Sequence, residues 1–192
     1  MYIIVFIKIH NFLISKSYTV LMGNINIYID ANNLHRRAIE LGFQINYKKF
    51  TGWLKQKYKA KNVYLFLGFI SKLRNHYTEL AEAGLILIFK DVTYINNSAK
   101  GNCDAEMVLK IISDFYTKSF DSCLILTGDG DFGCIIDFLK NHNSLLGVIA
   151  PDKNSCSFLL KRNKTPITFL NPHYHKFSTP KNEKAPDADV SA

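Results

Sequence analysis

Hydrophobic residues recur in two alternating patterns along this chain of 192 residues. Short, mostly apolar runs, typical of buried strands, occupy residues 24–30, 62–69, 85–89, 124–127 and 145–150. Helical spacing of apolar residues fits residues 33–41, 47–59, 72–83, 104–116, 131–141 and 155–162. Residues 167–170 fit one more short strand, and the polar stretch 91–102 predicts a loop. Strands that alternate with helices predict an α/β fold, a parallel sheet with helices on both faces.

We expect the five main strands in the order 3-2-1-4-5, numbered along the chain, as in doubly wound sheets. In this order the first and fourth strands are neighbours, and they flank the point where the strand order reverses. Ligands of such sheets bind outside the carboxyl ends of the strands at that point. The candidate site is therefore expected after residues 30 and 127.

One domain is expected over residues 23–170, with different material at each end. Residues 1–22 are apolar, but polar and charged residues interrupt them too often for a membrane span, and the basic start of a signal peptide is lacking. We interpret them as an N-terminal extension with Met22 as the natural start; a membrane-associating segment is the alternative. Residues 171–192 are rich in Pro, Lys, Asp and Ala without periodicity, and this predicts a disordered tail.

Charge is distributed unevenly. The net charge is +8, and residues 31–78 hold ten Lys and Arg against one acid, whereas residues 79–170 hold nine against eleven. A basic charge of this kind points to a polyanionic partner or simply to solubility. The four cysteines lack metal-ligand spacing, so we predict reduced thiols in a cytoplasmic protein without a zinc site.

Acidic residues mark the expected site. Asp30 ends the first strand, Asp129 and Asp131 follow the fourth, and Asp104 begins the helix that leads into the fourth. Two unit charges about 4 Å apart repel by roughly 4 kcal/mol at an effective dielectric near 20. Such a cluster therefore needs either raised pKa values or a divalent cation.

Oxygen donors without His or Cys favour Mg²⁺ or Mn²⁺ over Zn²⁺. We expect Gly128 and Gly130 to allow a sharp turn that directs both neighbouring aspartates to the metal. Each acid also has an ordinary explanation: Asp131 as a helix N-cap, Asp104 as a first-turn acid, Asp30 in an Asx-turn. Their joint occurrence at strand-to-helix transitions favours the metal site.

Three segments, "IYIDANNL" (27–34), "KGNCDAEMVL" (100–109) and "LILTGDGDF" (124–132), resemble in order and spacing the three motifs of the NYN-domain family. These are PIN-like nucleases that include the LabA-like proteins of bacteria, and the resemblance covers about residues 24–170. It implies a Rossmann-like PIN fold and metal-dependent cleavage of RNA.

The resemblance also implies roles for particular residues. Asn33 would ligate metal or orient water, the Thr127 hydroxyl would bond a carboxylate or phosphate, and Lys100 would meet a phosphate. The catalytic and metal-binding set would be Asp30, Asp104, Asp129 and Asp131, the last as ligand or general base.

One position departs from the pattern. LabA-like relatives often carry a further Asp where this chain has Lys110. Either Glu106 or Asp114 substitutes, or the site binds one metal well and a second poorly. Lys110 would favour the alternative function, a non-catalytic RNA- or protein-binding module. A small-molecule phosphatase is a third hypothesis, disfavoured because the first strand supplies a single acid.

Arg36 and Arg37 follow Asp30 within about two helical turns, so we expect them to bind substrate phosphates. The expected partner is RNA, single-stranded or structured, with no membrane; whether the chain forms a homodimer is left open.

Overall fold

The computed structural model describes residues 23–91, 93–95, 98–100, 103–162 and 164–180. The predicted N-terminal extension, residues 1–22, lies outside the described residues, as do residues 181–192. Within the described part, no helix is long and apolar enough to cross a membrane.

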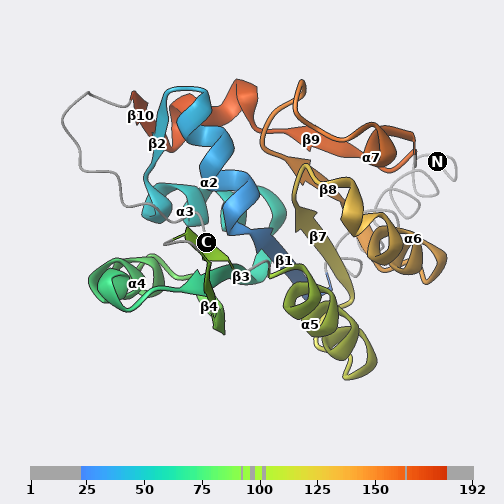
Figure 1. Cartoon of the computed structure of the whole chain (residues 1–192). Helices are drawn as coiled ribbons and strands as arrows, with labels where there is room; N and C mark the ends of the chain where they lie inside the picture. The colour runs from blue at the N-terminus through green and yellow to red at the C-terminus, as the bar shows by residue number, and fades with distance from the viewer. Residues whose placement is uncertain (1–22, 92, 96–97, 101–102, 163, 181–192) are drawn as a thin grey trace, which may run out of the picture.

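A six-stranded sheet forms the centre of the molecule (Figure 1). Its order is β4-β3-β1-β7-β8-β9, and every neighbouring pair is parallel. The predicted order of five strands is present, and β9 extends it beyond β8. The strands are β1 (Ile25–Asp30), β3 (Ala60–Phe69), β4 (Ile86–Asp91), β7 (Ser122–Leu126), β8 (Leu145–Ala150) and β9 (Ile167–Phe169).

Helices cover both faces of this sheet, which confirms the predicted α/β class. One face packs against α2 (Ala31–Glu40), α3 (Tyr47–Tyr58) and α4 (Arg74–Glu82). The other packs against α5 (Asp104–Tyr116), α6 (Gly133–Asn141) and α7 (Phe158–Arg162). Short 3-10 turns lie at η1 (Ser71–Leu73), η2 (Gly130–Phe132) and η3 (Asn171–Lys176).

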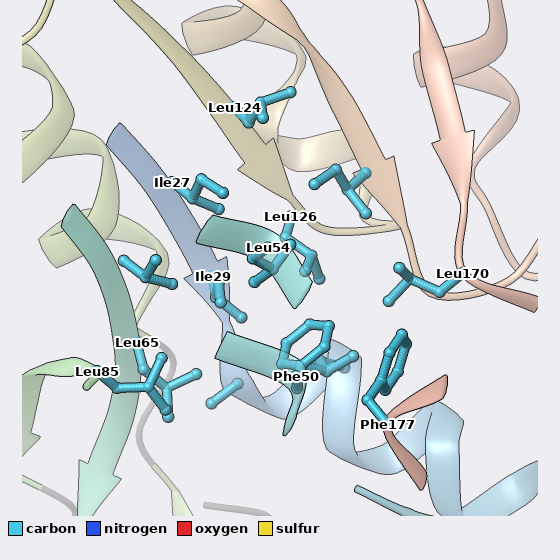
Figure 2. Close-up of a cluster of buried hydrophobic side chains, with 14 of the residues drawn as sticks. Ile27, Ile29, Phe50, Leu54, Leu65, Leu85, Leu124, Leu126, Leu170 and Phe177 are labelled. Carbon is cyan, nitrogen blue, oxygen red and sulfur yellow. The ribbon is translucent and has the colours of Figure 1, made fainter. Parts of the chain in front are cut away.

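The first face has a dense core, drawn in Figure 2. Ile27 and Ile29 of β1 lie in it beside Leu54 of α3, all fully buried. The ring of Phe50 faces that of Phe177, with centroids 4.8 Å apart. Alternate residues of β1 therefore face this core, and Tyr28 between them enters the core on the other face.

The predicted tail begins too early. Residues 171–180 form η3 and the strand β10 (Ser178–Pro180), which pairs antiparallel with β2 (Phe43–Ile45). Tyr174 and Phe177 are fully buried. Two aromatic anchors among prolines, lysines and histidines show no periodicity, so the sequence pattern could not reveal this packing.

The predicted loop 91–102 contains an antiparallel pair of strands, β5 (Thr93–Ile95) and β6 (Ser98–Lys100). Thr, Tyr and Ile are residues that favour strands, but a run of three is too short for a period of two to be recognised.

Candidate metal centre

Three of the predicted acids lie together. Asp104 is the first residue of α5, Asp129 follows β7, and Asp131 lies in η2. Each offers a carboxylate oxygen within 4.8 Å of those of the other two. We call these residues the acidic trio. Three hard oxygen donors at this spacing fit Mg²⁺ or Mn²⁺, because both ions prefer carboxylate oxygen.

Asp30 lies next to the trio but outside this group of three. It is the N-cap of α2, and its Oδ1 accepts a hydrogen bond from the Asn33 N–H at 3.1 Å. Burial and, to a smaller extent, the negative charges of Asp104 and Asp129 raise the pKa of Asp30 to about 6, although two hydrogen bonds oppose the shift. Asp30 is thus electrostatically coupled to the trio.

Thr127 connects Asp30 to the loop of the trio. Its hydroxyl donates to Oδ2 of Asp30 at 3.1 Å, and its oxygen accepts from the Asp129 N–H at 3.1 Å. Because Thr127 is fully buried, these bonds are shielded from water. The Asp129 carboxylate in turn accepts a hydrogen bond from the Asp131 N–H at 3.0 Å, and this bond shapes the turn that carries Asp131.

Asn33 holds the same loop from the side of α2. Its Oδ1 accepts a hydrogen bond from the Gly128 N–H at 2.8 Å. The amide oxygen therefore positions the backbone between β7 and η2 in this structure, a role that differs from both functions implied by the family resemblance.

The reason for the two glycines also differs from the expected one. Neither Gly128 nor Gly130 has a positive φ, so a special backbone conformation does not require them. A Cβ on Gly130 would lie 2.5 Å from Oγ of Ser157 and 3.0 Å from Cδ1 of Leu159. A Cβ here would therefore force the side chains of Ser157 or Leu159 to shift.

Lys110 turns away from the trio. Its ammonium lies 2.6 Å from Oδ1 of Asp114 and 4.9 Å from the centre of the Tyr64 ring. Asp114 is buried, and its Oδ2 accepts from the Tyr28 hydroxyl at 2.8 Å. Asp114 therefore does not replace the missing family Asp.

Glu106, the other candidate for that replacement, does not belong to the trio either. Its Oε1 lies 3.2 Å from the Lys90 ammonium. The trio is thus the full set of clustered acids that the described residues supply.

The two predicted phosphate-binding arginines differ. Arg37 forms an ion pair with Oδ2 of the buried Asp152 at 2.7 Å and a second one with Glu40. Arg36 is 70% exposed, with Glu40 at 4.0 Å. In this structure Arg37 serves the fold through these ion pairs, and its expected role in phosphate binding stays a prediction. Lys100 lies in β6, whose side chains are outside the described part of the structure.

Two contributions to this edge were missed by sequence reasoning. Asn171 donates to Asp152 beside Arg37, and Cys156, Ser157 and Leu159 pack against the loop of the trio. Asn171 lies 19 residues from Asp152, and Ser157 lies 29 residues from Gly128, so no local spacing signals either contact.

Fold and site together define an α/β protein with a carboxylate cluster at the point where the strand order of its sheet reverses. The model of the NYN domain matches residues 24–168, and the chain belongs to the NYN-domain family, which is grouped with PIN-like nucleases.

A similar solved structure is that of a protein of unknown function from Vibrio parahaemolyticus. The two share 18% sequence identity with a TM-score of 0.67, over 82% of this chain and 96% of that one. This likeness supports the fold. No curated protein matches the chain in sequence.

Proposed function

We propose that this protein is a metal-dependent nuclease, and that its substrate is RNA. The observation that carries the proposal is the acidic trio, whose oxygens lie within 4.8 Å of one another at the sheet edge of a NYN domain. Carboxylates this close together repel one another, which is unfavourable for folding, so a function that uses the cluster is the simplest explanation.

Asp104, Asp129 and Asp131 would hold Mg²⁺ or Mn²⁺, with Asp30 as a neighbouring fourth carboxylate. A bound divalent cation would polarise a phosphoryl oxygen and lower the pKa of water that attacks it.

The chain's own residues keep the carboxylates in place. Thr127 joins Asp30 to the backbone of Asp129. Asn33 fixes Gly128, the residue before Asp129. Asp131 is the exposed member of the trio, so it is the one that faces an approaching substrate and can accept a proton there. Preorganised groups of this kind lose little free energy to reorganisation during reaction.

Arg36 is the candidate for contact with a substrate phosphate next to Asp30, because its side chain is largely exposed. Lys100 stays a proposal from the family motif. The net charge of +8 favours a polyanion, whose binding should weaken steeply as salt is added. Four free thiols accord with the predicted cytoplasmic location.

The test is cleavage of a labelled single-stranded RNA by purified protein with Mn²⁺, Mg²⁺ or EDTA. Asp129→Asn should lower the rate by about 100-fold or more, since metal binding supplies several kcal/mol of transition-state stabilisation. Asp137→Asn, an exposed acid of α6 outside the trio, is the matched control and should cleave normally. RNA binding without cleavage by the wild type would contradict the proposal and favour the binding module.

A further inference from the structure

A short segment after β8 packs directly on the loop of the acidic trio. The Ser157 N–H donates to the Gly128 carbonyl at 2.8 Å. Gly130, the residue between two members of the trio, lies so close to Ser157 and Leu159 that it has no room for a Cβ. The start of α7 is therefore fixed at the rim of the candidate metal centre.

Phe158 lies between these two contact residues, yet it is 73% exposed. Leu159 beside it is 46% exposed, whereas Leu160 is 1% exposed and anchors α7 in the core. Leu160 thus anchors the helix in the core, and Phe158 presents a large ring to solvent one residue after Ser157, which contacts the loop of the trio.

Cationic residues lie before and after Phe158 in the sequence. Lys161 and Arg162 follow on the same helix, and both are exposed. The Lys161 ammonium donates to the Lys153 carbonyl at 2.9 Å, and this contact holds a third exposed cation beside α7. An exposed aromatic ring among cations is the combination that binds single-stranded nucleic acid, with the ring stacking on a base and the cations meeting phosphates.

We propose that Phe158 is a base-stacking residue, which holds an unpaired nucleobase of the RNA next to the phosphate at the metal centre. This inference rests on the proposed nuclease function and deepens it, because it names single-stranded RNA as the substrate class. In duplex RNA the bases are stacked within the helix and are not available to the ring.

The experiment measures binding of a fluorescent single-stranded RNA in EDTA, so that hydrolysis does not enter. Phe158→Ala should raise the Kd about tenfold, because stacking on an aromatic residue has this magnitude. Phe158→Trp should bind as the wild type does. The matched control is Tyr116→Ala: Tyr116 is 70% exposed at the far end of α5, about 18 Å along the helix from Asp104.

Two readouts separate stacking from a general loss of affinity. An RNA containing 2-aminopurine should lose fluorescence on binding the wild type and Phe158→Trp, and much less on binding Phe158→Ala. Binding of duplex RNA should change less than twofold. Thermal unfolding should be unaltered in Phe158→Ala, since the removed ring lies largely in solvent.

Equal Kd values for the wild type and Phe158→Ala would overturn the inference, and so would undetectable binding by the wild type. A change in self-association without a change in RNA binding would overturn it too, and would make Phe158 a protein contact. Cleavage by the wild type and its loss in Asp129→Asn are measured separately, so the nuclease function can stand when this inference fails.

Discussion

Two carboxylates at the same edge of the sheet, the half-buried Asp30 and the buried Asp152, have opposite properties. Asp30 ends β1, and Asp152 follows β8 by two residues. Burial and neighbouring acids raise the pKa of Asp30 to about 6. Burial alone would raise the pKa of Asp152 too, but its hydrogen bonds hold it below the usual range.

The difference lies in the neighbours. Arg37, Asn171 and two backbone N–H groups donate to Asp152, so its negative charge is compensated within the protein. Asp30 receives two hydrogen bonds but lies beside Asp104 and Asp129.

A compensated buried charge stabilises a fold, whereas a carboxylate placed among other carboxylates is suited to bind a cation from solution. This comparison separates the structural acid from the functional ones at one sheet edge.

The largest expected effect on stability comes from removing Arg37, the cation that pairs with Asp152. Arg37→Ala would leave a buried carboxylate without its cation and should lower the free energy of unfolding by about 3–5 kcal/mol. Urea unfolding at pH 7 measures this. The control Arg36→Ala removes a largely exposed side chain and should change stability by less than about 0.5 kcal/mol. Equal effects of the two variants would contradict the structural role of Arg37.

Removing the charge of Asp30 should raise stability, whereas removing Arg37 should lower it. Because its folded pKa is raised, the folded protein binds more protons than the unfolded chain between about pH 4 and 6, and stability falls as pH rises through this range. In metal-free protein, Asp30→Asn should therefore be more stable than the wild type above pH 6, by up to about 3 kcal/mol. The difference should vanish below about pH 4.

Unfolding curves measured from about pH 2 to 8 in EDTA test this, and Mn²⁺ or Mg²⁺ should reduce the difference above pH 6 by stabilising the wild type more. Asp152→Asn should behave in reverse: its carboxylate contributes stability above about pH 4 that is lost as pH falls, because its folded pKa is lowered. The same pH dependence for both variants would remove the distinction between the two acids.

Gly130→Ala tests the packing that positions the trio. Its Cβ would overlap Ser157, and the resulting shift should cost about 1–3 kcal/mol and reduce cleavage, since both neighbouring aspartates must move. Gly133→Ala is the matched control, because a Cβ there meets nothing within 4 Å. Calorimetric unfolding and cleavage assays on both variants should show a clear difference; equal results would mean that the loop tolerates displacement.

Thr127→Val gives the smallest expected effect. It keeps the shape of the side chain but removes the two hydrogen bonds to Asp30 and Asp129, at a cost of about 1 kcal/mol. Thr127→Val should therefore cleave RNA more slowly than the wild type, whereas Thr127→Ser retains the hydroxyl and should cleave as the wild type does. A fully active Thr127→Val would show that the carboxylates do not depend on this link.

Much of the fold could be predicted because its strands are continuous apolar runs in a parallel sheet. The acids of the trio could be predicted because each lies at a strand-to-helix transition. The short strands could not: Ser178 pairs with Ile45 across 133 residues, and three residues carry no usable period. Likewise, Arg37 resembles a phosphate ligand until its partner, 115 residues away, is known.

The packing of η3 and β10 has a consequence for where the chain can be shortened. The family match ends at residue 168, but Asn171, Tyr174 and Phe177 complete the Asp152 network and the core around Phe50. A protein cut at the family boundary would expose those aromatic contacts to water and would be prone to aggregation. The part of this protein that folds as a unit is therefore longer than the part that matches the family model.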